Sequence, residues 1–336
     1  MQRSETPRAT DMEWDALREK TLAAHEVPAL FEEIEVDDSG DQLEEFTNAD
    51  GIPVGAYATE LALWEMKTGR YTPAPNAKRS LWSRIKHGVI ANAMDHLGYP
   101  EIDHRPGVML HPRLDAMSSR LDALASRDGH TYEPVIAFNV PSTKVSTWRG
   151  SDGDWQPPFH VLLQAQHHMA VRRCEAVHVV ALVGGVDPRT FLIEADPEMI
   201  EDIEAAVVDF FEAVASDTQP RPDPDRDLRV LQRLAPPKED EGAEADLSED
   251  RAFLDLINER NALTKQRSDL EKDIKRISAQ ITERMSGFER ARISDTQEVA
   301  WVRKKGGPVS YIAKPSVHFV VRKIPQARKD KAASAS

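Results

Sequence analysis

Asp122 is the residue whose sequence context best suits it to chemistry. It lies in a short segment of strand type, and a second strand is expected about ten residues further on. A carboxylate in this setting is a common way to hold a hard cation such as Mg²⁺, which prefers anionic oxygen ligands. His167 and His168 are adjacent, so on a helix their side chains point about 100° apart and make a poor pair of metal ligands. The sequence contains no P-loop, nucleophile-elbow or HExxH motif.

The periodicity of apolar residues predicts the elements that must position Asp122. Helices are expected at 11–31, 59–69, 80–97, 161–172 and 197–215. Strands are expected at 107–110, 120–124, 133–140, 176–183 and 190–194, with a hairpin turn at 184–187. Strands mixed with flanking helices predict an α/β or α+β fold, with a mixed sheet covered by helices.

The remaining residues are expected to form further parts after a main domain at 1–216. Residues 217–250 are rich in Pro, Asp and Glu, which predicts a linker. Residues 251–290 carry apolar side chains in heptad-like registers. These registers predict a coiled coil or another partner-facing helix, and the alternative is a helix packed on its own domain. A small basic β unit is predicted at 291–326, and a disordered tail at 327–336.

Charge is distributed unevenly along the chain. The 336 residues carry a formal net charge of −14, which taken whole disfavours a non-specific polyanion binder. However, Arg251–Ser336 holds 19 Lys and Arg against 10 Asp and Glu, and residues 67–94 contain basic residues but no acid. The acidic residues are concentrated before them, including a block at 32–50. Net charge therefore says little against DNA as a partner.

Cysteine content and hydropathy indicate the compartment. A single cysteine, Cys174, excludes an internal disulfide framework and a cysteine-rich zinc site. No apolar run approaches the ~20 residues that a membrane span requires, and the first 25 residues contain no signal-peptide core. These features predict a soluble cytoplasmic protein.

A series of short motifs runs in order through residues 11–216. The most specific are ELALWEMKTG at 60–69 and QAQHHMAV at 164–171. Weaker ones lie at 13–31, 82–91, 121–124, 135–142, 182–185 and 193–196, and the C-terminal helix matches more loosely. In these motifs and their spacing the chain resembles the YqaJ-type viral recombinase family, phage alkaline exonucleases related to lambda exonuclease.

The resemblance implies a PD-(D/E)XK, restriction-endonuclease-like core with Mg²⁺- or Mn²⁺-dependent exodeoxyribonuclease activity on double-stranded DNA ends. It also implies a bacterial or phage-encoded recombination protein, a trimeric ring around DNA and a partner single-strand annealing protein. The cationic residues expected to contact DNA are Arg18, Lys67, Arg70, Arg79, Arg84 and Lys86.

The departures from the family fall where its chemistry is done. In the family, a helix glutamate, a strand aspartate and the glutamate of Glu-x-Lys bind magnesium, and the lysine assists the attacking water. Carried onto this sequence, these positions are His87, Asp122, Ala137 and Asn139. Asp122 and the flanking Gln164 are retained as candidate catalytic residues, and Asp122 and His87 as candidate metal ligands. Histidine suits Mn²⁺ or Zn²⁺ better than Mg²⁺, and asparagine cannot replace the charge or the proton of lysine.

The sequence therefore predicts a recombination protein that acts on DNA ends with catalysis lost or strongly weakened. One alternative is a catalytically silent DNA-end-binding or scaffold protein. Another is an active exonuclease whose missing groups are replaced by Glu133 or Lys144. A third possibility is that the acidic block at 32–50 occupies the DNA channel as a phosphate mimic.

Overall fold

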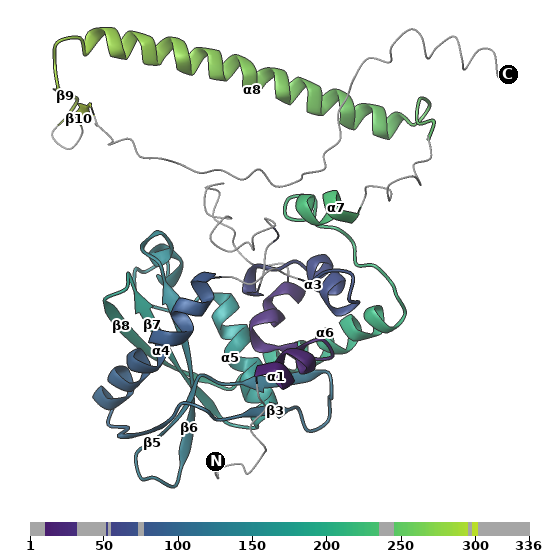
Figure 1. Cartoon of the computed structure of the whole chain (residues 1–336), viewed down its shortest axis with the longest axis vertical. Coiled ribbons are helices and arrows are strands. Elements are labelled where there is room, and N and C mark those ends of the chain that lie inside the picture. The colour runs from purple at the N-terminus through teal and green to yellow at the C-terminus, as the bar shows by residue number, and fades with distance from the viewer. Residues whose placement is uncertain are drawn as a thin grey trace. The chain divides into compact units, whose positions relative to one another are not determined.

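The structure is a computed structural model that describes residues 11–31, 52, 55–72, 77–234, 245–294 and 298–301. The chain divides into two compact units, residues 1–235 and 236–336 (Figure 1). The first unit thus extends beyond residue 216, where the sequence suggested that it ends. Within the described residues, no helix combines the length and the apolar character that crossing a membrane requires.

A five-stranded mixed sheet forms the centre of the first unit (Figure 1). Its strands, in order across the sheet, are β2 Glu101–Asp103, β5 Ala123–Ser126, β6 Tyr132–Val140, β7 Ala176–Val183 and β8 Asp187–Glu194. β6 and β7 are parallel, and the other neighbours are antiparallel. β7 is apolar and buried along almost its whole length, as expected of a strand covered on both faces.

One helix covers each face of this sheet. α4, Ala77–His96, shares a buried apolar cluster with Val135. α5, Phe159–Arg172, shares another with Ile136. Neighbouring residues of a strand point to opposite faces, so the two helices lie on opposite sides of β6. The predicted mixed α/β architecture with flanking helices is confirmed.

A second, three-stranded sheet has the order β1-β4-β3. It consists of β1 Leu22–Ala23, β4 Met117–Arg120 and β3 Val108–Leu110. β4 ends before Asp122, and β5 begins after it in the other sheet. The single strand predicted at 120–124 is therefore wrong. The N–H of Asp122 donates to the carbonyl of Val135 at 3.2 Å, which ties this crossing point to β6.

The helix predicted at 11–31 is also wrong in its extent. α1 covers only Asp11–Arg18, β1 follows, and residues Ala24–Leu30 form a 3₁₀ helix, η1. The chain leaves the helical path because β1 pairs in parallel with β4. The carboxylate of Glu26 accepts the N–H of Ala23 at 3.0 Å, which stabilises the turn into η1.

Two other helices of the first unit, α3 Glu60–Lys67 and α6 Pro197–Ala215, lie close to their predicted positions. The sequence predicted none of η2 Gly55–Tyr57, η3 Ser142–Trp148 and α7 Leu228–Leu234. α7 lies in the segment that the sequence suggested to be a linker. Val230 of α7 is buried in the same apolar cluster as Leu61 and Leu63, so residues up to 234 belong to the folded unit.

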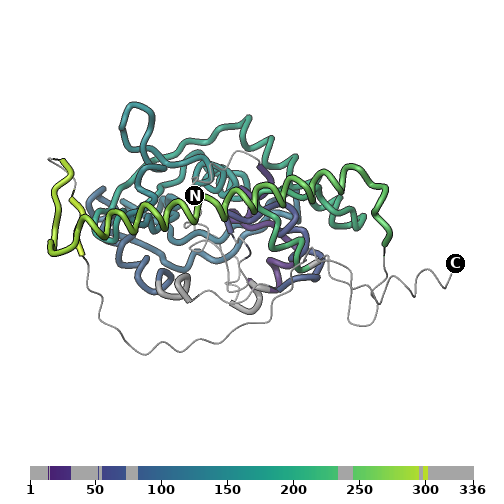
Figure 2. Tube along the Cα trace, turned by 90° about the horizontal axis from the view of Figure 1, so that it is seen from above, coloured from purple at the N-terminus to yellow at the C-terminus, as the bar shows by residue number. Residues whose placement is uncertain are grey.

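The second unit contains one long helix, α8 Arg251–Arg284, as the heptad-like pattern predicts (Figures 1 and 2). None of its residues is buried. A short antiparallel pair follows, β9 Arg290–Arg292 with β10 Glu298–Ala300. The rest of the basic β unit predicted at 291–326, and the tail predicted at 327–336, lie outside the described residues.

Candidate functional site

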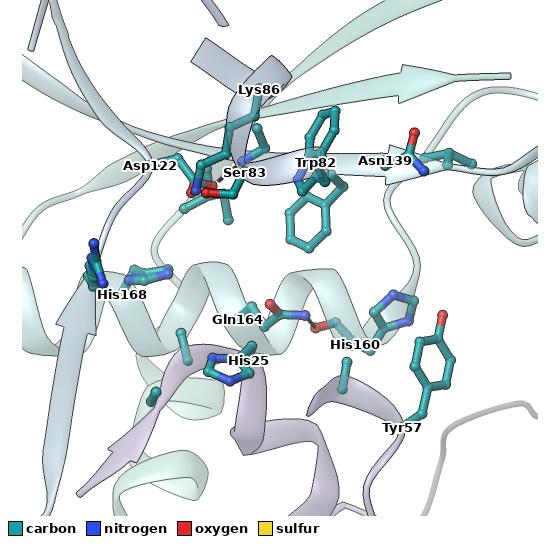
Figure 3. Close-up of a pocket in the computed structure, with 18 of the residues that line it drawn as sticks. His25, Tyr57, Trp82, Ser83, Lys86, Asp122, Asn139, His160, Gln164 and His168 are labelled. Carbon is teal, nitrogen blue, oxygen red and sulfur yellow. Dashed lines mark hydrogen bonds and ion pairs between the residues drawn. The ribbon is translucent and has the colours of Figure 1, made fainter. Parts of the chain in front are cut away.

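A cleft of about 540 Å³ is lined by residues of α4, β6 and α5, among other elements (Figure 3). α1, η1, η2, α4, β6, η3 and α5 all contribute side chains to it. Its charged lining among the described residues consists of Arg18, Lys86, Arg120 and Lys144, with Asp122 as the one carboxylate. Its aromatic lining is Trp14, Tyr57, Trp82, Phe138 and Trp148.

Asp122 is held by two neighbours within this cleft. One carboxylate oxygen pairs with the ammonium of Lys86, and the other accepts the backbone N–H of Ala137 at 2.8 Å. The Asp122 and Lys86 side chains are 21% and 22% exposed. Both oxygens of this carboxylate therefore already have a donor, and its charge is neutralised by a cation of the chain itself.

The structure brings together most of the residues singled out from the sequence. Asp122, Ala137, Asn139 and Gln164 all line the cleft. His87 is not among the described residues that line it, and its ring stacks on that of His104 with centroids 4.6 Å apart. Successive side chains of a helix point about 100° apart, so a helix that directs Lys86 toward Asp122 directs the next residue elsewhere.

The donor set around Asp122 does not fit a magnesium ion. Mg²⁺ requires near-octahedral oxygen coordination and is usually held by one or two carboxylates together with substrate phosphates. Here the single carboxylate is bonded to Lys86. In the part of the chain that the structure describes, no group of three or more His, Cys, Asp or Glu side chains is arranged to hold a metal ion.

Neutral histidines and an amide from α5 form the opposite wall. Burial, reinforced by Lys144, lowers the pKa of His160 to about 4. Burial also lowers the pKa of His168 well below its usual value, and its Nδ1 lies 2.8 Å from the hydroxyl of Ser119. Gln164 donates from Nε2 to the carbonyl of His160 at 3.0 Å. Both imidazoles are therefore uncharged at neutral pH, and this wall is polar without carrying charge.

The neighbouring histidine of α5 is structural. The Nε2 of His167 donates to the carbonyl of Ser118 at 2.9 Å, and its side chain is fully buried. Burial lowers the pKa of His167 to about 4. The two adjacent histidines thus bond to neighbouring residues of β4, which agrees with the view that they do not form a metal-binding pair.

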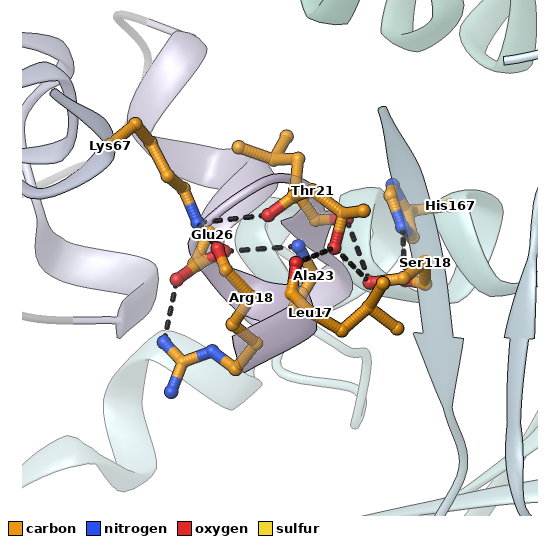
Figure 4. A network of polar contacts seen from close by, with 9 residues as sticks. Leu17, Arg18, Thr21, Ala23, Glu26, Lys67, Ser118 and His167 are labelled. Carbon is orange, nitrogen blue, oxygen red and sulfur yellow. Dashed lines mark hydrogen bonds and ion pairs between the residues drawn. The ribbon is translucent and has the colours of Figure 1, made fainter. Parts of the chain in front are cut away.

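Arg18 reaches the cleft from a buried ionic network (Figure 4). Its guanidinium donates to one oxygen of Glu26 at 2.6 Å, and Lys67 donates to the other at 2.8 Å. Lys67 also donates to the carbonyls of Arg18 and Thr21, at 2.6 and 2.9 Å. Burial alone would raise the pKa of Glu26, but the charges of Lys67 and Arg18 hold it far below its usual value.

The cations expected to contact DNA are placed differently from one another. Arg18 and Lys86 line the cleft. The Lys67 side chain is only 3% exposed and its ammonium has three acceptors, so it has no free surface for a phosphate. Arg70 lies on the surface, paired with an aspartate and stacked on Trp64.

The last two of these cations lie on α4. Arg84 is exposed there and is not among the described residues that line the cleft. The side chain of Arg79 lies outside the described part of the chain, and so does the acidic block at 32–50.

Several residues of the cleft carry no strong signal in the sequence. Arg120 lies two residues before Asp122 and would point to the same face of a strand. Tyr57 and Trp82 come from separate elements, and only the folded chain brings them to Gln164 and His160 (Figure 3). The one sequence feature that indicates a role for them is that these aromatic residues lie near a basic segment, a combination typical of nucleic-acid binding.

Glu133, the proposed substitute for the missing glutamate, is engaged elsewhere. Its carboxylate accepts from the hydroxyl of Tyr99 and lies near Nε2 of His178, each at 2.7 Å. It is not among the described residues that line the cleft, whereas Lys144, the proposed substitute for the lysine, is. The Lys144 residue is 7% exposed.

Comparisons with known proteins give structural neighbours only. No family model and no curated protein matches the chain. A crystal structure of an alkaline exonuclease, LHK-Exo from Laribacter hongkongensis, is similar at 16% sequence identity with a TM-score of 0.43. The same exonuclease in complex with dAMP is similar at 16% identity with a TM-score of 0.44. Each match covers 67% of this chain and 97% of the exonuclease chain.

Proposed function

We propose that this chain binds the end of a DNA duplex in the cleft beside Asp122, and that it has lost or strongly weakened the metal-dependent hydrolysis of the family it resembles. The observation that carries the proposal is the ion pair between Lys86 and Asp122, the one carboxylate among the described residues of the cleft. A lysine of the chain takes the charge-neutralising role that a metal ion has in a nuclease.

The electrostatics of the cleft support binding of a phosphate backbone. Of the residues that the structure describes, four Lys and Arg side chains and one carboxylate line it, although the whole chain has a net charge of −14. A cleft lined mainly by one sign of charge concentrates the field and attracts the opposite charge. Lys and Arg contacts to phosphates supply most of the sequence-independent affinity for nucleic acids.

The aromatic lining supports contact with bases at a strand end. Tyr57 and Trp82 reach the cleft from two different elements, η2 and α4 (Figure 3). Aromatic side chains stack on unpaired bases of any sequence, and a basic groove with stacking platforms is a common design for single-stranded nucleic acid. A duplex end offers both a phosphate backbone and a base pair that opens easily.

The same residues explain why hydrolysis is disfavoured. Lys86 must leave Asp122 before a divalent cation can use this carboxylate, and no second carboxylate lines the cleft among the described residues. Asn139 is neutral and cannot transfer a proton as a lysine can. The neutral His160 and the amide of Gln164 can orient a bound strand by hydrogen bonds. The Mg²⁺ or Mn²⁺ cofactor that the family resemblance implies stays a prediction. The groups around Asp122 do not favour it, because its carboxylate is bonded to Lys86.

A second candidate is an active exonuclease with relocated groups. The observation in its favour is that Lys144 lines the cleft that contains Asp122, so a lysine is available near the missing Glu-x-Lys position. The engagement of Glu133 with Tyr99 and His178 counts against it, because the described residues then supply no second carboxylate beside Asp122. A trimeric ring and an annealing protein as partner stay predictions of the resemblance.

The proposal is tested by binding in the absence of metal. A fluorescently labelled linear duplex is titrated with the full chain in EDTA, and bound DNA is challenged with unlabelled linear or closed circular duplex. We expect the linear competitor to displace the label at lower concentration, because only it has ends. Equal competition by the circle, or no binding at all, would overturn the proposal.

A further inference from the structure

The segment 223–234, which we call the strap, lies beyond the predicted end of the main domain and is nevertheless built into its core. Asp227 is 1% exposed and Val230 is 2% exposed. The strap begins with a turn in which the side chain of Asp223 accepts the N–H groups of Asp225 and Arg226, at 2.9 and 3.2 Å. It then continues as α7.

Two successive residues of the strap hold three successive residues of another segment. Arg226 donates from one guanidinium nitrogen to the carbonyls of Tyr57 and Ala58, at 2.9 and 3.0 Å. The next residue, Asp227, accepts from the hydroxyl of Thr59. Burial raises the pKa of Asp227, so this carboxylate depends on its hydrogen bonds to remain in the interior.

The segment held in this way forms a wall of the cleft. Ala56 and Tyr57 of η2 line the cleft, and the Tyr57 ring lies 5.5 Å from that of His160, centroid to centroid. Thr59 begins α3 by accepting the N–H of Ala62 at 3.1 Å. The strap therefore fixes both the backbone that presents Tyr57 and the start of the following helix.

We propose that Arg226 and Asp227 are positioning residues that hold Tyr57 in the cleft, where it stacks on the terminal base of the bound strand. The identity of the ligand, a DNA strand end, rests on the proposed function. The positioning of Tyr57 by Arg226 and Asp227 does not depend on it. It assigns the support of one wall of the cleft to a segment beyond residue 216. A chain cut after 216 would keep Asp122, Lys86 and Gln164 and would lose the support of Tyr57.

The positioning is tested first without DNA, by hydrogen–deuterium exchange of the full chain. Arg226→Ala is expected to speed exchange of the 55–60 amides by about tenfold, because the two charge-assisted hydrogen bonds that order the segment are lost. Arg229→Ala is the matched control, since Arg229 lies three residues further on in the strap, is exposed on α7 and donates to Gln232 of the same helix. Arg226→Gln keeps a hydrogen-bond donor at this position and serves as a second variant in case Arg226→Ala unfolds the whole domain. We expect it to speed exchange of the 55–60 amides less than Arg226→Ala does.

The contact with the ligand is tested by affinity for the labelled duplex end. Tyr57→Ala is expected to weaken binding about tenfold, in line with the loss of one base–aromatic stack. Arg226→Ala should weaken binding by a similar factor alone and by little more in the Tyr57→Ala background, because both act through one ring. Arg229→Ala should bind as the unmodified chain does.

The outcomes separate the two proposals. Unchanged exchange at 55–60 in Arg226→Ala overturns the positioning role, whether or not DNA binds. Faster exchange with no binding by the unmodified chain supports the positioning and overturns the proposed function. Faster exchange with full affinity in Tyr57→Ala overturns the base contact.

Discussion

Lys86 and Asp122 face each other in the cleft, and each is about one fifth exposed. An ammonium on the chain neutralises a carboxylate, but it cannot bind and activate a water for attack. In a metal-dependent nuclease the divalent cation supplies that activated water. Because Lys86 offsets the charge of Asp122, the surface keeps the net positive charge of Arg18, Arg120 and Lys144. At this scale the cleft is suited to holding phosphates rather than to cleaving them.

Replacing this lysine should weaken DNA binding in the absence of metal. Lys86→Met removes one cation and leaves the charge of Asp122 uncompensated, so we expect about a fivefold loss of affinity for a duplex end in EDTA. Fluorescence anisotropy measures it. Arg113→Met is the control, because Arg113 is exposed, pairs with Glu204 and is not among the described residues of the cleft. Equal or tighter binding by Lys86→Met would count against the role of this pair.

Lys67 should matter for stability rather than for binding. Lys67→Met leaves the buried Glu26 with Arg18 as its one remaining cationic hydrogen-bond partner among the described residues, and we expect a loss of about 3 kcal/mol in the free energy of unfolding. Denaturant unfolding measures the change. Arg70→Met should cost much less, because its pair with Asp217 is exposed. Similar losses in both variants would contradict the structural role of the network.

The same network predicts how stability depends on acid. The pKa of Glu26 is lower in the folded than in the unfolded chain. Its contribution is therefore fully present above the usual glutamate value of 4.5 and is lost as the pH falls below it. Lys67→Met reduces this depression, so its unfolding free energy should fall less steeply below that pH. An unaltered slope would show that Lys67 does not set the pKa of Glu26.

At the scale of elements, the structure shows which local sequence patterns are enough to predict the limits of a helix or strand. The limits of β7 and α6 match the sequence expectation because each has a strong period of its own and clear end signals. The segment 120–124 reads as one strand because nothing local shows that its halves pair in different sheets. α7 is missed because its burial depends on Val230 meeting residues far away in the sequence.

The residues of the candidate site likewise divide into those that a local motif predicts and those that only tertiary contacts bring to the cleft. Asp122, Gln164, Ala137 and Asn139 are found from motifs that are each a short continuous stretch of sequence. The partner of Asp122 is displaced by one residue from the expected His87, and a shift of one position on a helix turns a side chain by about 100°. Tyr57, Arg120 and Lys144 become neighbours through tertiary contacts, which no local period reports.

Gln166 connects α5 to the turn between β8 and α6. Its Nε2 donates to the carbonyl of Glu194, and its Oε1 accepts the N–H of Asp196, both at 2.9 Å. Gln166→Leu should therefore lower the free energy of unfolding by about 2 kcal/mol. Gln164→Leu is the comparison, because the hydrogen bond from Gln164 to the carbonyl of His160 lies within one helix, and it should change stability little. Equal thermal shifts in the two variants would contradict the bridging role.

At the scale of the whole molecule, net charge and local charge point in opposite directions. The chain carries −14, yet the charged side chains that line the cleft in the described part of the chain are four basic and one acidic. Exposed charges more than about 10 Å apart are largely screened at moderate salt, so a bound strand responds mainly to the cleft. An acidic protein can therefore bind DNA ends.

If the cations of the cleft bind phosphates, the affinity for DNA should depend on salt concentration, and each cation should contribute a part of that dependence. The logarithm of affinity for a duplex end should fall linearly with the logarithm of salt concentration, and Arg120→Met, which removes an exposed cation of the cleft, should reduce the magnitude of the slope by about one. Titrations at several salt concentrations measure both slopes. Arg113→Met should leave the slope unchanged. A binding constant that does not respond to salt would rule out phosphate recognition by the cleft.

The central claim is that the chain binds DNA ends without cutting them because Lys86 replaces a metal at Asp122. The most direct test is release of nucleotides from end-labelled duplex, with Mg²⁺ and with Mn²⁺, by the unmodified chain and by the combined variant Lys86→Glu, Ala137→Glu and Asn139→Lys. We expect the unmodified chain to bind the duplex and release no nucleotide, and the variant, which regains carboxylates and a lysine around Asp122, to cleave with metal. Cleavage by the unmodified chain as fast as by the variant would contradict the account.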